Sequence, residues 1–261
     1  MSNYWQQQKD TPLYEAIAWS RPENAQHAGK LLIIGGNSFA FAAPAEAYSV
    51  ADKAGAGALR VVLPDALEKI VGHSAFDAYF APTNSSGSFS KQALDTMLVH
   101  SQWSDAVLVA GDLGKNSETA VLLETFTKKY NGLLCITKDT VDYFLQNPSE
   151  LLARPHTLVV LSYEQLQKFG TSLKITQPLT FGLPAPAVVA WLHDLTLNYS
   201  ATILTYHNNQ LFVAANGQVA TQVDTQYTEK IWRVSAAAKA SVFTMQHPDE
   251  QFKAAVTSLL L

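Results

Sequence analysis

Backbone amides at two short segments near the N-terminus are the first groups whose arrangement suits chemistry. Residues 31–34 form an apolar run typical of a strand buried on both faces, and Gly35, Gly36 and Asn37 follow it directly. Ala42-Ala43-Pro44 then opens a helix of small residues, expected over residues 43–53, with proline where a missing N–H costs nothing. Glycine lets the backbone approach a ligand, and a helix N-terminus favours negative charge. The order of strand, glycine pair and helix therefore predicts a site for an anionic group.

This segment is not the dinucleotide-binding fingerprint. That motif places G-x-G-x-x-G between a strand and the helix that follows it. Here the residues after the strand read GGNSFAFAA, and the triplet Gly55-Ala56-Gly57 lies after the helix, before the expected strand at residues 59–63. A dinucleotide site of the Rossmann type is therefore excluded.

Side chains that could bind a metal or act as a nucleophile are not clustered in the sequence. The seven histidines lack the i, i+4 or short-loop spacing of a metal site, so no metal is expected. Neither a Walker A sequence nor a nucleophile elbow occurs. Cys135 lies inside an apolar run, where a thiol is typical of a small buried hydrophobe. Any retained small-molecule site is therefore expected at the glycine-bearing strand ends.

Apolar strand-like runs alternate with helical patterns along most of the chain. Such alternation predicts an α/β fold whose central sheet is mainly parallel and covered by helices on both faces. The expected strands are residues 31–34, 59–63, 106–110, 133–136, 157–161 and 202–206. The expected helices between them are residues 43–53, 91–100, 117–130, 140–146 and 187–199. Asn216-Gly217 then predicts an antiparallel hairpin of residues 211–215 and 218–223, before two helices around residues 229–245 and 248–260.

The opening segment and this layout resemble the ribokinase-like ATP/ADP-dependent NAD(P)H-hydrate dehydratases, a carbohydrate kinase-like family that repairs nicotinamide nucleotides. The family opens roughly as K-G-x-x-G-x-x-L-x-x-G-G-S, followed by G-A-P, a small-residue helix and A-G-A-G. The matching residues are Gly29, Leu32, Gly35, Gly36, Asn37, Ala42-Ala43-Pro44 and Ala54-Gly55-Ala56-Gly57. The resemblance implies a three-layer α/β/α domain over residues 29–261, after an N-terminal arm of residues 1–28. It also implies ATP, ADP or an NAD(P)-type nucleotide as the ligand.

Two further segments carry the resemblance into the middle of the chain. The family's G-P-G-L-G corresponds to residues 110–114, where Leu113 and Gly114 match, and its D-A-D-A-L-N to residues 137–142, where Asp139 matches. The resemblance places these three residues at the ligand site with the glycines. Asp139 is also well placed to cap a helix that begins at Thr140, and this structural role is the alternative.

The catalytic motif of the family is missing. At the start of its last long helix the family has G-T-G-D, whose backbone binds phosphate and whose aspartate serves as a base. No glycine occurs between Gln218 and Leu261, and Arg233 or Val234 stands at the position of the aspartate. Asp224 and Glu229 are the remaining candidates for a catalytic carboxylate, although both precede the expected place.

Other departures remove groups that would contact phosphate. Asp112 replaces a glycine of G-P-G-L-G, and its carboxylate is expected to repel a phosphate by about 1 kcal/mol or more. The family's T-P-H-x-G-E corresponds to residues 162–167, without the histidine and the glutamate, and its L-K-G to residues 204–206, without the lysine. Together these losses predict that the scaffold has been kept and its ATP chemistry lost.

Composition narrows the class of protein and its partners. With 261 residues, 48% hydrophobic and 15% charged, the chain can bury a substantial core and is not typical of disorder. A net charge of −4 gives no reason to expect nucleic acid or a membrane surface as a partner, and no apolar run is long enough to span a bilayer. The N-terminus has no apolar signal segment, so a cytoplasmic protein is expected. Trp5, Tyr14 and Trp19 are candidates to pack on the body of the chain or on a second copy in a homo-oligomer.

Three functions are open at this point. The first is a divergent dehydratase-like protein that no longer uses ATP or ADP and retains at most the binding of a nucleotide-like ligand or a partner. The second is an active ATP/ADP-dependent NAD(P)H-hydrate dehydratase, or a small-molecule kinase, with a remodelled site. The third is an enzyme with different chemistry in the inherited cleft. Because a fold does not fix a function, the missing residues favour the first.

Overall fold

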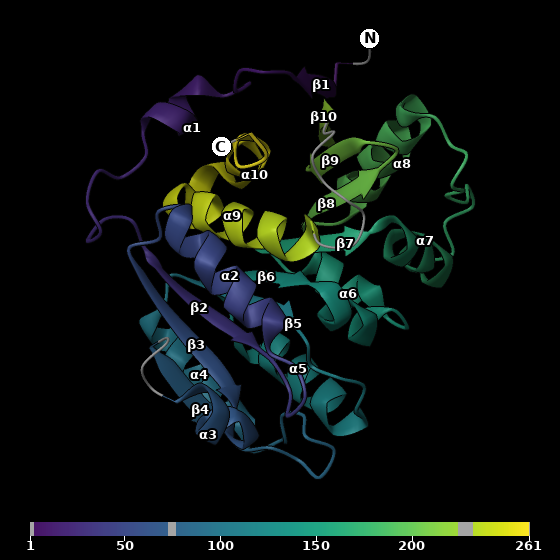
Figure 1. The fold of residues 1–261 in the computed structure, drawn as a ribbon. Coiled ribbons are helices and arrows are strands. Elements are labelled where there is room, and N and C mark those ends of the chain that lie inside the picture. Colours follow the sequence, from purple (N-terminus) through teal and green to yellow (C-terminus); the bar gives the residue numbers. More distant parts are fainter. Residues whose placement is uncertain (1–2, 73–76, 224–231, 261) are drawn as a thin grey trace.

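A ten-stranded, mainly parallel sheet forms the centre of the molecule (Figure 1). The computed structural model describes residues 3–72, 77–223 and 232–260. Within them the strand order is β1-β10-β9-β8-β7-β6-β5-β2-β3-β4, and only β9 runs antiparallel to its neighbours. The strands are β1 (Trp5–Gln8), β2 (Lys30–Gly35), β3 (Ala58–Pro64), β4 (Ala78–Ala81), β5 (Ala106–Gly111), β6 (Leu133–Thr137), β7 (Thr157–Ser162), β8 (Thr202–His207), β9 (Gln210–Ala215) and β10 (Gln218–Val223). The sequence-based prediction of an α/β fold with a C-terminal hairpin is confirmed.

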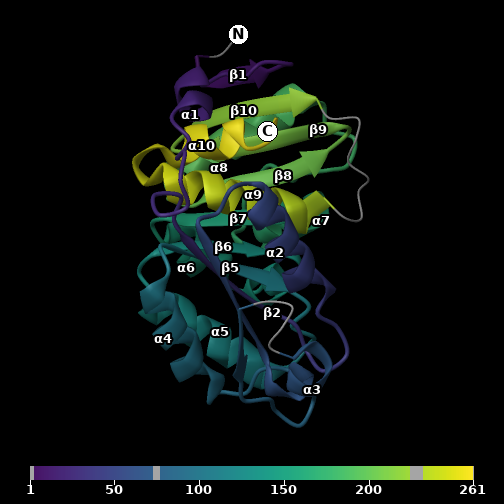
Figure 2. The ribbon, with the colours of Figure 1, turned by 60° about the vertical axis from the view of Figure 1, so that its left-hand side comes forward.

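Helices cover both faces of this sheet and complete three layers. One face carries α2 (Ala42–Lys53), α9 (Trp232–Gln246) and α10 (Gln251–Thr257), and Figure 2 shows α2 and α9 lying together across the strands. The other face carries α4 (Ala93–Trp103), α5 (Ser117–Lys129), α6 (Pro148–Ala153), α7 (Tyr163–Ser172) and α8 (Ala185–Asn198). Shorter elements connect these layers: α1 (Glu15–Trp19), α3 (Glu68–Val71) and the 3₁₀ turns η1 (Asp65–Leu67), η2 (Lys138–Phe144) and η3 (Pro248–Glu250).

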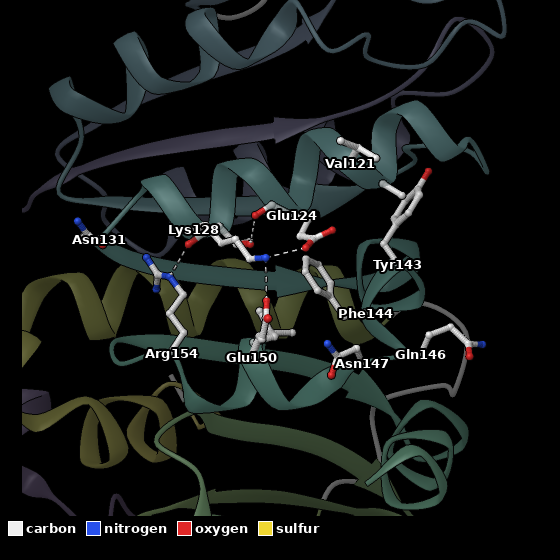
Figure 3. A pocket seen from close by; sticks show the side chains of 13 residues that line it. Val121, Glu124, Lys128, Asn131, Tyr143, Phe144, Gln146, Asn147, Glu150 and Arg154 are labelled. Carbon is white, nitrogen blue, oxygen red and sulfur yellow. Dashed lines mark hydrogen bonds and ion pairs between the residues drawn. The ribbon is translucent and has the colours of Figure 1, made fainter.

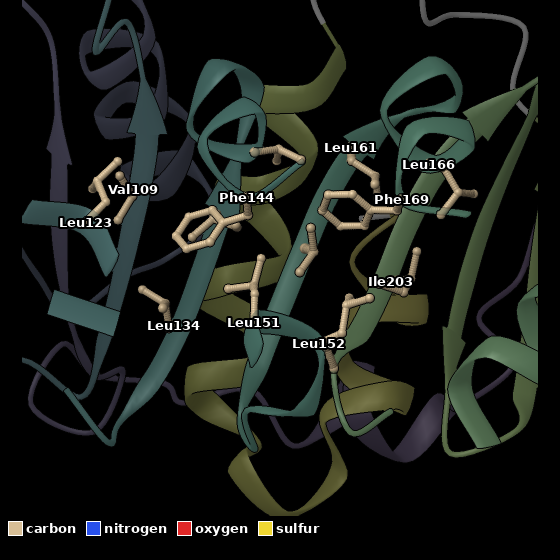
Figure 4. Close-up of a cluster of buried hydrophobic side chains, with 14 of the residues drawn as sticks. Val109, Leu123, Leu134, Phe144, Leu151, Leu152, Leu161, Leu166, Phe169 and Ile203 are labelled. Carbon is tan, nitrogen blue, oxygen red and sulfur yellow. The ribbon is translucent and has the colours of Figure 1, made fainter. Parts of the chain in front are cut away.

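Alternation along each strand sends side chains into two separate cores. In β2, Leu31 and Ile33 pack on the α2–α9 face, whereas Leu32 and Ile34 pack on the α4–α8 face. All four are fully buried, as expected for a parallel strand with helices on both sides. Figure 4 shows part of the second core, in which side chains from β5 to β8 meet residues of α5, η2, α6 and α7. This packing fixes the strand ends that carry the candidate site.

The segment before β2 contributes an edge strand to the sheet. β1 pairs in parallel with β10, and the Trp5 indole donates a hydrogen bond to the Thr221 hydroxyl at 3.0 Å. The Gln8 side-chain amide donates to the Gln222 side chain at 2.7 Å and to the Val256 carbonyl at 2.8 Å. The first strand is therefore tied to the last strand and to α10.

Two tight turns join β8, β9 and β10. Asn208 and Asn209 have φ values of 48° and 59°, and Asn216 and Gly217 have φ values of 49° and 73°. Two consecutive residues with positive φ give the type I′ geometry that suits the twist of a hairpin, and asparagine and glycine adopt it most readily. The hairpin predicted at Asn216-Gly217 is confirmed.

Some elements differ from the sequence-based expectations. β1, β4, α3, α6 and α7 were not expected, and residues 138–144 form the 3₁₀ turn η2 instead of an α-helix over residues 140–146. Within the described ranges, none of the helices has both the length and the apolar character that a membrane crossing requires.

Candidate functional site

The residues predicted to bind a ligand meet at the carboxyl ends of β2 and β5. The backbone N–H of Gly36 donates to the Gly111 carbonyl at 2.9 Å, and the Asn37 side-chain amide donates to the Asp112 carbonyl at 2.6 Å. β2 and β5 approach so closely here that a Cβ atom on Gly35 would lie 2.7 Å from the Gly111 carbonyl oxygen. The segments that the sequence singled out therefore lie close together, and their binding of a ligand stays a prediction.

A carboxylate of the chain itself lies at the start of α2. Asp112 follows β5 with a positive φ of 59°, and its Oδ2 accepts a hydrogen bond from the backbone N–H of Ala43 at 2.7 Å. Its Oδ1 forms an ion pair with the Lys138 ammonium group, and only 10% of the Asp112 side chain is exposed. The favourable position for an anion at this helix N-terminus is thus filled by Asp112.

The carboxylate of Asp139 accepts hydrogen bonds from a second pair of backbone N–H groups. Its two carboxylate oxygens accept hydrogen bonds from the N–H groups of Asp112 at 2.7 Å and Leu113 at 2.8 Å. Burial raises the pKa of Asp139 above its ordinary value, and these two hydrogen bonds oppose that rise. The expectation that Asp139 caps the following helix is wrong, because Thr137 occupies the N-cap position of η2 and the carboxylate faces the β5 loop instead.

The residues that directly follow two neighbouring strands have a strained backbone, with positive φ. Lys138, directly after β6, has a φ of 58°, similar to that of Asp112 after β5. Non-glycine residues in this region cost on the order of 1 kcal/mol each and persist where surrounding contacts hold them. Here the holding contacts are the Asp112–Lys138 ion pair and a hydrogen bond from Gln165 to the Lys138 carbonyl at 2.9 Å.

Gln165 joins this cluster to the start of α9. Its amide nitrogen also donates to Asp142 Oδ1 at 2.7 Å, and its oxygen accepts from the Ser162 N–H at 3.0 Å and from the Arg233 guanidinium at 3.1 Å. Burial lowers the pKa of Arg233, and the negative charges of Asp142, Asp139 and Glu164 act in the opposite direction. Arg233 therefore faces acidic groups where the family resemblance would place a catalytic aspartate.

Asp224 and Glu229, the catalytic candidates, lie outside the described residues. In the part of the chain that is described, no group of three histidine, cysteine, aspartate or glutamate side chains is arranged to hold a metal ion.

A cavity of about 490 Å³ opens beside the carboxylates of Asp139 and Asp142, and we call it the strand-end cavity. It is lined by Gly114, Lys115, Asn116, Ser117, Ala120, Asp139, Asp142, Tyr143, Leu145 and Lys168. The Asn116 side chain caps α5 by accepting from the N–H groups of Glu118 and Thr119 at 2.8 and 3.3 Å. Gly114 and Asp139 are the two predicted ligand residues that reach this cavity.

The roles of Lys138, Gln165 and Arg233 were not found from the sequence. Lys138 and Arg233 act through partners at least 26 positions away, so no local spacing reveals them, whereas Ser162 and Gln165 have the S-x-x-Q spacing of a capping box, a local signal that points to Gln165. The positive φ of Lys138 is a property of the folded backbone, and lysine gives no sequence signal for it.

Comparison with solved structures identifies the fold. A ribokinase-like superfamily protein from Enterococcus faecalis superimposes with a TM-score of 0.75 at 14% identity, covering 100% of this chain and 87% of that chain. A Bacillus subtilis protein of the UPF0031 family gives a TM-score of 0.63 at 10% identity, covering 95% of this chain and 86% of that chain. The B. subtilis ADP/ATP-dependent NAD(P)H-hydrate dehydratase, crystallised with ATP and Mg²⁺, gives 0.60 at 11% identity with the same coverage. No protein-family model and no curated protein matches the sequence. The chain has the ribokinase-like fold.

Proposed function

We propose that this protein is a divergent relative of the NAD(P)H-hydrate dehydratases that has lost ATP- and ADP-dependent catalysis and retains ligand binding at its strand-end cavity. Its fold is shared with kinases and with the B. subtilis dehydratase. Fold alone does not assign an activity, so the proposal depends on the groups at the site.

The observation that carries the proposal is the position of the Asp112 carboxylate. It accepts the Ala43 N–H at the start of α2, and Lys138 neutralises it from the other side. A phosphate arriving at this helix would have to displace a bonded carboxylate and would meet its negative charge. Asp139 blocks the N–H groups of Asp112 and Leu113 in the same way.

The start of α9 also supports the proposed loss of ATP- and ADP-dependent catalysis. No glycine occurs from Gln218 to the end of the chain, and without glycine a tight anion-binding turn would cost about 1–2 kcal/mol for each residue forced to positive φ. Arg233, one residue inside α9, is turned toward Gln165 and acidic side chains. A guanidinium cannot act as a general base, because it stays protonated.

The size of the expected defect follows from these losses. Removing anion-hole donors costs on the order of 10²–10³ in rate, and removing a general base costs a further 10² or more. Dehydration of hydrated NADH is therefore expected to be absent, or at least a thousandfold slower than in an intact family member. The test is recovery of NADH absorbance from its hydrate with ATP or ADP present.

Binding measurements separate the loss of phosphate recognition from the loss of chemistry. We expect no calorimetric binding of millimolar ATP or inorganic phosphate to the wild-type protein. Asp112→Gly frees the Ala43 N–H and should allow phosphate binding, whereas Asp142→Asn removes a nearby charge without freeing that amide. Equal ATP affinity of the wild type and Asp112→Gly would refute the role given to Asp112.

The second candidate is a remodelled dehydratase or small-molecule kinase, favoured by the ATP and Mg²⁺ present with the B. subtilis neighbour. In that case turnover near one per second would be seen in the same assay. Its loss on changing Asp224 or Glu229 to alanine would identify the replacement carboxylate.

A further inference from the structure

Two Asn-Gly pairs occur in the sequence, Asn131-Gly132 and Asn216-Gly217. Asparagine is a chemically labile residue, and in such a pair the backbone nitrogen of the glycine can attack the Cγ atom of the asparagine. Glycine hinders this attack least, because it has no Cβ atom. Both asparagines are exposed, so the contacts of the folded backbone decide which pair reacts.

The peptide unit between Asn131 and Gly132 is not held by hydrogen bonds. It lies in the connection between α5 and β6, outside both elements. Within the described ranges, the Asn131 carbonyl, the Asn131 side chain and the Gly132 N–H hydrogen-bond to no other residue. Figure 3 shows the Asn131 side chain apart from the ion pair between Lys128 and Glu150. Rotation of this peptide unit, which brings the Gly132 nitrogen to the Asn131 Cγ atom, therefore breaks no hydrogen bond of the described residues.

The Arg154 guanidinium lies beside this peptide unit. It donates hydrogen bonds to the carbonyl of Tyr130 and, at 2.8 Å, to the carbonyl of Gly132. The chain is therefore held on either side of the peptide unit that has to rotate. A nearby positive charge favours the deprotonated form of a group. Because the attack requires loss of the Gly132 amide proton, Arg154 favours the reactive form of that nitrogen.

The contacts of the second pair oppose the same reaction. Asn216 and Gly217 form the turn between β9 and β10, with φ values of 49° and 73°. The Gly217 N–H donates to the Thr196 hydroxyl at 3.2 Å, and Thr196 is only 2% exposed. Rotation of this peptide unit would break that hydrogen bond and disturb the pairing of Gln218 with Ala215.

We propose that Asn131 is a site of spontaneous deamidation in the folded protein and that the fold protects Asn216 from the same reaction. The Gly132 nitrogen forms a bond to the Asn131 Cγ atom, and the side-chain nitrogen leaves with the amide proton as ammonia. Water then opens the resulting cyclic succinimide at one of its two carbonyls, which gives aspartate or isoaspartate at position 131. Either product places a new carboxylate near the Arg154 guanidinium. Isoaspartate also adds a methylene group to the main chain two residues before β6.

The test follows both pairs in one sample of the wild-type full chain, incubated at pH 8 and physiological temperature. Mass spectrometry of proteolytic peptides measures the exchange of amide for acid at each asparagine, and an isoaspartate methyltransferase labels the isoaspartate. We expect Asn131 to react at least about tenfold faster than Asn216, which corresponds to about 1.4 kcal/mol in activation free energy. Comparable rates, or faster reaction at Asn216, would overturn the proposal.

Unfolding the chain separates the effect of the fold from that of the local sequence. In guanidinium chloride both pairs lose their contacts, so the two rates should converge. A tenfold difference that persisted in the unfolded chain would refute the role given to the fold. This comparison needs no substitution.

Two variants assign the reaction to its residues. Asn131→Gln should abolish the isoaspartate signal of the folded protein, because its longer side chain would have to close a larger ring, and an undiminished signal would place the reaction elsewhere. Thr196→Val removes the acceptor of the Gly217 N–H, so it should speed the reaction at Asn216 and leave the rate at Asn131 unchanged. An unchanged rate at Asn216 in the folded variant would refute protection by Thr196. If Thr196→Val does not fold, the folded and unfolded wild type still decide the proposal.

Discussion

Replacing Asp112 by glycine tests whether its carboxylate serves as an internal substitute for an anionic ligand. The change removes the acceptor for the Ala43 N–H, worth about 1 kcal/mol at a helix start, and a favourable charge near the helix dipole, worth about 0.5 kcal/mol. It also removes the ion pair with Lys138, which is 36% exposed, for about 1 kcal/mol. Against these losses, glycine relieves the positive φ by about 1 kcal/mol.

The losses outweigh the relief of strain, so we expect the free energy of unfolding to fall by about 1–2 kcal/mol. For a chain of this size that corresponds to a decrease in Tm of roughly 2–8 °C. Asp112→Ala is the matched variant, since it loses the same contacts but keeps a Cβ at φ 59°, and it should be about 1 kcal/mol less stable than the glycine variant.

The assay is urea unfolding followed by tryptophan fluorescence, with the slope m compared among the three proteins. A glycine variant as stable as the wild type would refute the reasoning, because strain would then equal or exceed the contacts of the carboxylate. A double-mutant cycle with Lys138→Met isolates the ion pair, and a coupling energy near zero would show that Lys138 does not hold Asp112.

Three further changes test other parts of the structure. Arg154→Ala should lower the free energy of unfolding by about 3 kcal/mol, because carbonyls at the end of α5 and before β6 lose charged donors. Arg154→Lys should recover less than half of that loss, since lysine lacks the forked guanidinium, and urea unfolding measures both variants. Cys135 should not react with iodoacetamide at pH 8 until the protein unfolds, since burial raises its pKa to about 12, and mass spectrometry of native and urea-treated samples measures this. The pKa of Asp139 is raised, so the folded state binds the carboxyl proton more tightly than the unfolded state does. As pH rises from 3.8 through the raised pKa, the wild type should therefore lose free energy of unfolding relative to Asp139→Asn, which does not titrate. Unfolding midpoints between pH 3.5 and 6 that move the opposite way would contradict that sign.

The fold could be predicted where buried parallel strands gave long apolar runs. Residues 31–34 and 106–110 fall inside β2 and β5, because strands covered on both faces need apolar side chains on both sides. β1 was missed since its sequence, WQQQ, has no apolar alternation, and its position depends on pairing with β10. β4 was missed because it is only four residues long at the other edge of the sheet.

The sequence indicated strand ends that meet in the structure, but not the contacts made by the groups between them, and ligand binding there stays a prediction. Gly35 is the last residue of β2 and Gly36 follows it, one residue later than the expected strand end at Ile34. The Asp112 carboxylate was expected to repel a ligand phosphate, and the structure adds that it bonds the Ala43 N–H, a residue 69 positions earlier. Asp139 was expected to act as either a ligand residue or a helix cap. Its bonds to Asp112 and Leu113 depend on where two neighbouring strands end, which no local pattern specifies.

The pairing of β1 with β10 has a consequence for the order in which the molecule assembles. Gln8 and Gln222 are separated by 214 positions in the sequence, yet their side chains hydrogen-bond. At 5–20 residues per second, a ribosome takes about 10–40 s to make the chain between them. During that time residues 5–8 have no partner strand, so their backbone N–H and C=O groups are unpaired. A strand of only four residues is a poor template for aggregation, both before β10 emerges and afterwards, when β1 still forms one edge of the sheet.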